Sequence, residues 1–425
     1  MFDLVSPDSV GLSAKRLQRV SAWMRSQVER QRLPGVSVLI NRRGDNAFFE
    51  AVGLADVEAG KPLAADTIFR IYSMTKPITS VAAMMLYEEG RFQLDEPIAK
   101  FLPEFTEMQV WTGGDLDHPR LEPARSLITV RQLLTHTSGL TYEFMMNSPV
   151  DALYREHKIR YPGRTGTLAE VTQRLARLPL LFHPGSRWHY GVSTDVLGRL
   201  VEAISGQPLD RFFAERIFQP LGMVDTGFVV PADKLDRFAA LYVPAPGSVR
   251  PTPMDGVRPD QLHMEPKGGI KLADPPNGNF AQPGGTLSGG GGLTSTIADY
   301  LRFCRMLRNK GELDGQRLLG RKTVEFMTQN HLPGSLADMG QARFFNEAPG
   351  EGMGFGLGFT VVLDSAKAQT MGSPGEYFWH GMASTQFWID PVEDLIVLQM
   401  AQLAPSSTFP LRRELRSLVY QALVD

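Results

Sequence analysis

Cysteine is almost absent from this sequence of 425 residues, which contains only Cys304. A single cysteine excludes any disulfide bond within the chain, and such scarcity is typical of reducing compartments. Cys304 lies in "DYLRFCRML", where apolar residues recur at helical spacing, so we expect a buried core thiol rather than a nucleophile. The start of the sequence lacks a basic segment followed by an apolar run. We therefore expect no signal peptide and predict a cytoplasmic protein.

Long apolar runs and an excess of one charge are also missing. No uninterrupted apolar stretch approaches the roughly 20 residues of a membrane-spanning helix, so we predict no membrane association. The 44 basic and 46 acidic residues give a net charge of -2, which provides no basic surplus for binding nucleic acid. The eight histidines show no metal-ligand spacing, so we expect no metal and no other cofactor.

Several signature loops are missing as well. The sequence has no Gly-x-Ser-x-Gly, which argues against an α/β-hydrolase. The segment "GLADVEAGKP" has too many residues between its glycines for a phosphate-binding loop. The glycines of residues 284–292 are better interpreted as a tight turn.

The order of helical and strand patterns predicts an α+β fold. Apolar residues at helical spacing in 13–31 indicate an amphipathic helix, and residues 35–56 indicate a β-hairpin. Strand patterns return between 354 and 402, and a helix from 411 closes the chain. We expect one antiparallel sheet flanked by N- and C-terminal helices, formed by residues 1–84 and 290–425. Residues 85–289 alternate helical pieces with Pro- and Gly-rich segments and are predicted to form a mainly helical inserted domain. Within them, 243–285 is predicted to lack regular structure.

The stretch "IYSMTKPITS", residues 71–80, holds a candidate catalytic pair. On a helix Ser73 and Lys76 share a face, and a lysine amine with a depressed pKa can take the proton of a serine hydroxyl. Pro77 cannot donate to the carbonyl of Ser73, so the helix should begin at Ser73. The alternative is that Ser73 merely caps a helix and Lys76 lies at the surface.

Two later stretches hold further candidate residues. Tyr190, in "WHYGVSTD", precedes a predicted helix. Beside an ammonium group its phenol can relay protons, although most such tyrosines only pack on a loop. Gly381, in "FWHGMASTQFWIDP", interrupts an apolar strand. Either a ligand approaches the backbone there or the strand contains a bulge. A predicted helix from Thr296 begins like a capping box with Asp299.

Five motifs together resemble one family. In order they are "SMTK" at 73–76, "LLTHTSGLTY" at 133–142, "WHYGVSTDVLGRLVE" at 188–202, "GGGGLTSTIADYLRF" at 289–303 and "WHGMASTQFWIDP" at 379–391. The chain is similar over almost its whole length to the family VIII carboxylesterases, which share the fold of class C β-lactamases and DD-peptidases. The resemblance implies a β-lactamase/DD-peptidase-like fold and an acyl-enzyme mechanism.

The same resemblance implies roles for individual residues. Ser73 corresponds to the acylated nucleophile, Lys76 to its partner base and Tyr190 to the tyrosine that exchanges protons with nucleophile and leaving group. The amides of Ser73 and Met382 correspond to the oxyanion hole. Which of Lys76 and Tyr190 is the resting base is left open, because the two would titrate together.

Further residues are implied to line or support the site. Trp379 and Gly381 lie on the substrate-binding strand, and Tyr142 lines or braces the site. Asp195 supports it, or is simply a residue at a helix end. His380 could act as a second base, but a side chain on the other face of the strand is the simpler expectation.

Two positions depart from the β-lactamase pattern. The β-lactamase motif that begins with the tyrosine has asparagine two places on, where this sequence has Val192, and Trp379 replaces the lysine of Lys-Thr-Gly. Losing these polar groups disfavours anionic β-lactams, because each charge-assisted contact contributes about 1.5–3 kcal/mol. We therefore predict a serine carboxylesterase acting on small-molecule esters of short acyl chains, with "TYEFMM" at 141–146 closing one side of the site. An acyltransferase of the same fold, a β-lactamase or DD-peptidase, and a binding module without catalysis are the alternatives.

Overall fold

The computed structural model describes residues 2–245, 269–341, 343–344 and 348–425. Its main element is an eight-stranded antiparallel sheet in the order β14-β15-β16-β17-β18-β1-β2-β3. The strands are β1 (Gly35–Arg42), β2 (Asp45–Asp56), β3 (Lys61–Pro62), β14 (Met353–Phe355), β15 (Thr360–Val362), β16 (Tyr377–His380), β17 (Gln386–Asp390) and β18 (Leu395–Ala401). As the sequence predicts, the N-terminal hairpin pairs with the C-terminal strands. In the structure Val38 lies opposite Gln399.

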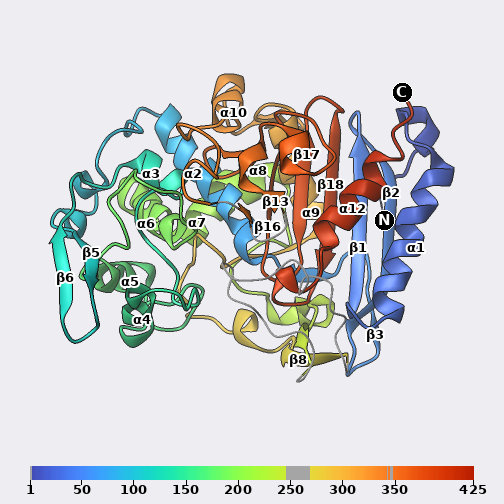
Figure 1. The fold of residues 1–425 in the computed structure, drawn as a ribbon. Coiled ribbons are helices and arrows are strands. Elements are labelled where there is room, and N and C mark those ends of the chain that lie inside the picture. The colour runs from blue at the N-terminus through green and yellow to red at the C-terminus, as the bar shows by residue number, and fades with distance from the viewer. Residues whose placement is uncertain (1, 246–268, 342, 345–347) are drawn as a thin grey trace.

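Helices cover both faces of this sheet. Phe387 and Trp388 are neighbours on β17, so their side chains point to opposite faces. Phe387 contacts Tyr300 of α9 (Ile297–Arg308), and Trp388 stacks on Tyr420 of α12 (Leu411–Tyr420). Helix α1 (Ala14–Glu29) lies beside α12 against β1 and β2 (Figure 1). This sandwiching explains why every residue of β1 and β18 is buried.

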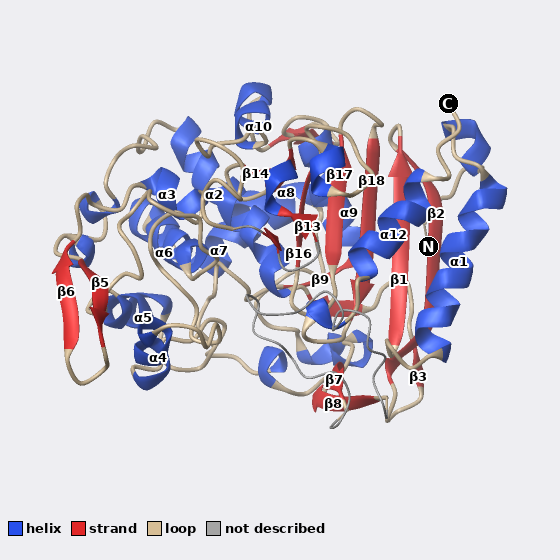
Figure 2. Cartoon of the chain, viewed as in Figure 1, coloured by secondary structure: helices blue, strands red, loops and turns tan. Residues whose placement is uncertain are grey.

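A mainly helical region lies on the side of the sheet away from α1 (Figure 2). Every strand of the eight-stranded sheet lies outside residues 85–289, while the division into two domains at those limits stays a prediction. Among the described residues of this region the longest helix is α6, which packs against α2. Helix α2 starts at Thr75, two residues after Ser73. The bounds are α2 (Thr75–Glu88), α3 (Val130–Leu134), α4 (Pro149–Glu156), α5 (Leu168–Leu175), α6 (Ser193–Ser205), α7 (Leu209–Phe213) and α8 (Gln219–Leu221).

Short pairs of strands lie outside the main sheet. They are β4 (Ile68–Arg70) with β9 (Thr294–Thr296), β5 (Gln109–Gly114) with β6 (Pro119–Pro123), β7 (Leu241–Pro244) with β8 (Ile270–Asp274), β10 (Glu312–Leu313) with β11 (Gln316–Arg317), and β12 (Arg343–Phe344) with β13 (Ala348–Pro349). The remaining helices are α10 (Arg321–Met327) and α11 (Ser365–Ala368).

Two local predictions are wrong in part. The sequence predicts no regular structure for residues 243–285, yet β7 pairs with β8, with Val243 opposite Lys271. Residues 246–268 lie outside the described part. Because Gly and Pro are frequent in that segment, its local sequence gives no strand signal. The strands β7 and β8 pair across the long stretch that separates them. The capping box at Thr296 is only half formed. Thr296 accepts from the amide of Asp299, but the Asp299 carboxylate accepts from the amide of Asp225 and the hydroxyl of Thr226 instead of the Thr296 amide.

Within the described ranges, no helix combines the length and the apolar character needed to cross a membrane. No group of three or more His, Cys, Asp or Glu side chains in that part of the chain is placed to hold a metal ion. Cys304 is fully buried in α9, and burial raises the pKa of its thiol, as expected for a core residue.

Candidate active site

Ser73 lies in one 3₁₀ turn, Tyr72–Met74, that leads directly into α2. Pro77 occupies the first turn of α2, where its missing N–H costs no hydrogen bond, as the sequence predicts. Tyr72 has a φ of 40°, in the left-handed region that non-glycine residues rarely adopt. The backbone therefore turns sharply immediately before Ser73.

The hydroxyl of Ser73 meets both groups that the sequence pairs with it. Tyr190 donates a hydrogen bond to Ser73 Oγ over 2.6 Å, and Lys76 Nζ lies 3.2 Å from the same oxygen. Tyr190 comes from the loop before α6, 117 residues along the chain. The structure thus brings Ser73, Lys76 and Tyr190 together around one oxygen atom.

Lys76 is a buried amine with three polar neighbours. Its side chain is essentially inaccessible to solvent, and Nζ lies 3.0 Å from Tyr142 Oη and 2.6 Å from the carbonyl oxygen of Gly290. Burial lowers the pKa of Lys76 to about 7, and the negative charge of Asp195 opposes this shift. An amine with this pKa is substantially neutral near physiological pH and can accept a proton.

The Asp195 carboxylate binds the glycine-rich turn whose carbonyl contacts Lys76. One carboxylate oxygen accepts from Ser288 Oγ at 2.5 Å and from the amide of Gly290 at 3.0 Å. The carbonyl of that same Gly290 is the one that contacts Lys76. A Cβ atom on Gly290 would lie 2.4 Å from the other Asp195 oxygen, so a side chain there would collide with the carboxylate. The role of Asp195 in supporting the site stays a prediction.

Aromatic rings surround Tyr190. Its ring centroid lies 5.2 Å from those of Tyr142 and His136 and 5.7 Å from that of Trp379. Burial raises the pKa of Tyr190, so its phenol stays protonated. Burial also lowers the pKa of His136 well below its usual value, so the imidazole adds no second positive charge beside Lys76.

Trp379 and His380 lie on β16, where the sequence places the substrate-binding strand. Trp379 is only 1% exposed and packs against Phe355, His136 and Tyr190, so its role as a wall that touches substrate stays a prediction. His380, the neighbouring residue on the strand, is also buried. Burial lowers the pKa of His380 well below its usual value, so the imidazole is neutral.

Gly381 and Met382 follow β16 at the turn into β17. A Cβ on Gly381 would lie 2.3 Å from the carbonyl oxygen of Ile71, so glycine lets this turn approach the backbone just before Ser73. In the described part of the chain the amides of Ser73 and Met382 donate no hydrogen bond. Free amides on two adjoining segments are the donors that an oxyanion requires.

Sequence reasoning missed three contributors to this site. The carbonyl of Gly290 contacts Lys76, Ser288 holds Asp195, and His136 packs on Tyr190. The run of four glycines at 289–292 is the sequence feature that could have pointed to these contacts, because glycine lets another group approach the backbone closely. Nothing local identifies the approaching group as a carboxylate.

The chain is similar to known proteins over most of its length. The Beta-lactamase family model matches residues 20–421. The chain is 38% identical to Protein Rv1367c of Mycobacterium tuberculosis, covering 88% of this chain and 86% of that one, and 34% identical to Esterase EstB of Burkholderia gladioli, covering 98% of both. It is similar in structure to EstCE1, a hydrolase with promiscuous acyltransferase activity, with a TM-score of 0.76 and 29% identity over 96% of this chain and 98% of that one.

These matches span nearly the whole chain, and the antiparallel sheet with its helices agrees with the fold that the five motifs imply. The recognition made from sequence and the predicted fold class are both confirmed. The chain belongs to the beta-lactamase family and is a serine hydrolase or acyltransferase of the β-lactamase fold.

Proposed function

We propose that this protein is a serine carboxylesterase that hydrolyses short-chain acyl esters of small molecules through an acyl-enzyme on Ser73. The observation that carries the proposal is the double contact at Ser73 Oγ, 2.6 Å from Tyr190 Oη and 3.2 Å from Lys76 Nζ. The 34% identity to Esterase EstB supports ester hydrolysis as the reaction.

The hydrogen bonds around Lys76 favour this lysine as the resting base. A neutral amine has two N–H groups and one lone pair. The Gly290 carbonyl can only accept, so it takes one N–H, and the Tyr142 hydroxyl takes the other. The lone pair then points to the proton of Ser73. Tyr142 in turn is hydrogen-bonded to Tyr190, which donates to Ser73.

Ser73, Lys76, Tyr142 and Tyr190 thus form a closed ring of hydrogen bonds along which one proton can pass, which we call the proton circuit. When Ser73 attacks the ester carbonyl, its proton passes to Lys76 Nζ and the carbonyl oxygen becomes negative between the Ser73 and Met382 amides. Collapse of this intermediate breaks the bond to the alcohol oxygen, which takes the Tyr190 proton. Tyr190 regains a proton from Tyr142, and Tyr142 regains one from Lys76. Water then takes the place of the alcohol and the transfers run in reverse: as its oxygen attacks the acyl carbon, its proton passes through Tyr190 and Tyr142 to Lys76, and Lys76 returns a proton to Ser73 as the acid is released.

Replacing Ser73 tests this assignment. Ser73→Ala should abolish hydrolysis of p-nitrophenyl butyrate while the thermal melting temperature changes little. Ser9→Ala, at an exposed serine in the N-terminal 3₁₀ turn, is the matched control and should keep wild-type activity. Wild-type activity in a folded Ser73→Ala protein would refute the assignment.

Acyl transfer is the second candidate reaction, because EstCE1 is a hydrolase with promiscuous acyltransferase activity. An alcohol can replace water in the second half of the reaction without any change in the protein groups. A panel of p-nitrophenyl esters with and without an added alcohol, together with a chromogenic cephalosporin, separates the candidates. We expect at most weak β-lactam hydrolysis, because Val192 and Trp379 offer neither the amide nor the cation that holds a β-lactam.

A further inference from the structure

Phe144 is an exposed aromatic side chain beside the site that the proposed reaction does not use. Its ring stacks on that of Tyr142 with centroids 4.7 Å apart and planes 17° apart, and the residue is 43% exposed. Tyr142 is buried and contacts Lys76. The pair therefore extends an aromatic surface from the proton circuit out to solvent.

The loop that carries Phe144 is fixed at both ends. On one side Arg155 donates to the carbonyl of Glu143 and to Asp151. On the other side Asp151 accepts from the amides of Asn147 and Ser148 at 2.9 and 2.7 Å. Because Asp151 is fully buried, this network fixes the loop before substrate arrives. A ring fixed in this way loses little conformational freedom on binding.

The position of Phe144 indicates which part of an ester it meets. In the proposed reaction the carbonyl oxygen turns toward the Ser73 and Met382 amides, and the alcohol oxygen receives the proton of Tyr190. The ring of Tyr142 lies 5.2 Å from that of Tyr190 and carries Phe144 on its face. The rings of Tyr190, Tyr142 and Phe144 thus form a continuous series that leads from the group that protonates the alcohol to an exposed ring.

We propose that Tyr142 and Phe144 bind the alcohol portion of the ester and that Phe144 gives the site a preference for alcohols bearing an aromatic ring. This inference rests on the proposed function. Stacking on an exposed ring adds affinity that a short alkyl group cannot match. The same surface binds an acceptor alcohol in the reverse of the leaving step, so it also governs acyl transfer.

The test compares benzyl acetate with ethyl acetate, which share an acyl group and release alcohols that both need a proton. Phe144→Ala should lower kcat/KM for benzyl acetate by about tenfold and leave that for ethyl acetate within about twofold. Phe144→Tyr, which keeps a ring, should retain the preference. Leu121→Ala is the matched control, because Leu121 lies on β6, outside residues 141–146, and is also 43% exposed; it should leave kcat/KM for both esters unchanged.

Two further readouts separate this inference from the proposed function. In Phe144→Ala the rate ratio of p-nitrophenyl acetate to butyrate should stay constant, and transfer of the acyl group to benzyl alcohol should fall relative to ethanol. Equal losses for benzyl and ethyl acetate, or a changed acyl-length ratio, would overturn the alcohol-side assignment. If instead hydrolysis of these esters persisted in Ser73→Ala, the proposed function itself would fail.

Discussion

Lys76 is the residue on which the proposed chemistry depends, because a buried amine is useful as a base only when it is neutral. Burial lowers its pKa to about 7. Tyr142 and Tyr190 stay protonated and His136 stays neutral, so Asp195 is the charge that acts on Lys76 among the groups of the site. Activity should rise with pH as Lys76 loses its proton, with the midpoint near pH 7.

Replacing Asp195 should shift this pH dependence in a definite direction. The Asp195 carboxylate raises the pKa of Lys76, so Asp195→Asn should lower that pKa and move the rising limb of the kcat/KM profile to lower pH. The asparagine oxygen can still accept from Ser288 and Gly290, which preserves the turn. Profiles of wild type and variant on p-nitrophenyl butyrate measure the shift. A rising limb that stays in place or moves to higher pH would contradict the coupling.

Tyr142 should matter most for esters whose alcohol needs a proton to leave. Tyr142→Phe keeps the ring that stacks on Phe144 but removes the hydroxyl that links Lys76 to Tyr190. We expect kcat/KM for ethyl acetate to fall by about 100-fold, a typical contribution of general acid–base catalysis. For p-nitrophenyl acetate the loss should be much smaller, because p-nitrophenolate leaves unprotonated. Equal losses for the two esters would show that Tyr142 does not relay the proton.

At the scale of elements, short-range patterns were the predictable part of the structure. The start of α2 follows from Ser73 and Pro77, which lie within one turn of each other, and the hairpin β1–β2 follows from alternating apolar residues and an adjacent turn. The five motifs then located Ser73, Lys76 and Tyr190 through a family resemblance. Only the structure shows that Lys76 and Tyr190 both contact Ser73 Oγ.

Some hydrogen-bond partners could not be predicted, because they come from distant parts of the chain. The Gly290 carbonyl reaches Lys76 across 214 residues. Likewise, the Asp299 carboxylate accepts from the amide of Asp225 and the hydroxyl of Thr226, so it does not complete the capping box at Thr296. Local spacing identifies residues capable of a hydrogen bond, but tertiary packing selects which partner they meet.

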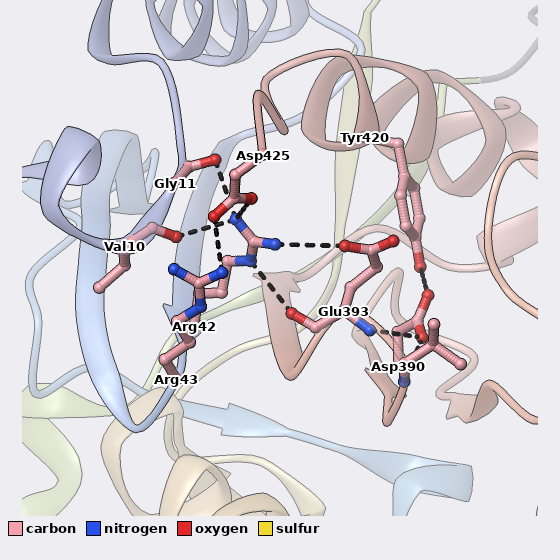
Figure 3. A network of polar contacts seen from close by, with 9 residues as sticks. Val10, Gly11, Arg42, Arg43, Asp390, Glu393, Tyr420 and Asp425 are labelled. Atoms are coloured by element: carbon pink, nitrogen blue, oxygen red, sulfur yellow. Dashed lines mark hydrogen bonds and ion pairs between the residues drawn. The ribbon is translucent and has the colours of Figure 1, made fainter.

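At the scale of the whole molecule, a segment near the N-terminus and the C-terminal residue meet at one buried arginine. Arg42, at the end of β1, donates to the carbonyls of Val10 and Gly11 at 2.9 Å and to Asp425 at 2.6 Å (Figure 3). It also binds Glu393 in the turn between β17 and β18. Arg42 is thus the point where the N-terminal segment, the C-terminus and the sheet are joined.

Removing this arginine should destabilise the fold without altering the chemistry. For Arg42→Ala we expect the free energy of unfolding to fall by about 2–4 kcal/mol, because buried carbonyls lose their donor and the acids lose their partner. Arg43→Ala is the matched control, since Arg43 also binds Asp425 but is largely exposed, and it should change stability by less than about 1 kcal/mol. Thermal and urea unfolding measure both variants. Equal stability of the two variants would contradict this role.

The central claim is that Ser73 carries the acyl group between the two halves of the reaction. The most direct measurement is mass spectrometry of protein quenched with acid during turnover of p-nitrophenyl butyrate, followed by proteolysis and peptide mapping. We predict one butyryl group per chain, located on Ser73 and absent from Ser73→Ala. A butyryl group on another residue, or continued turnover of p-nitrophenyl butyrate by Ser73→Ala without any adduct, would contradict the account.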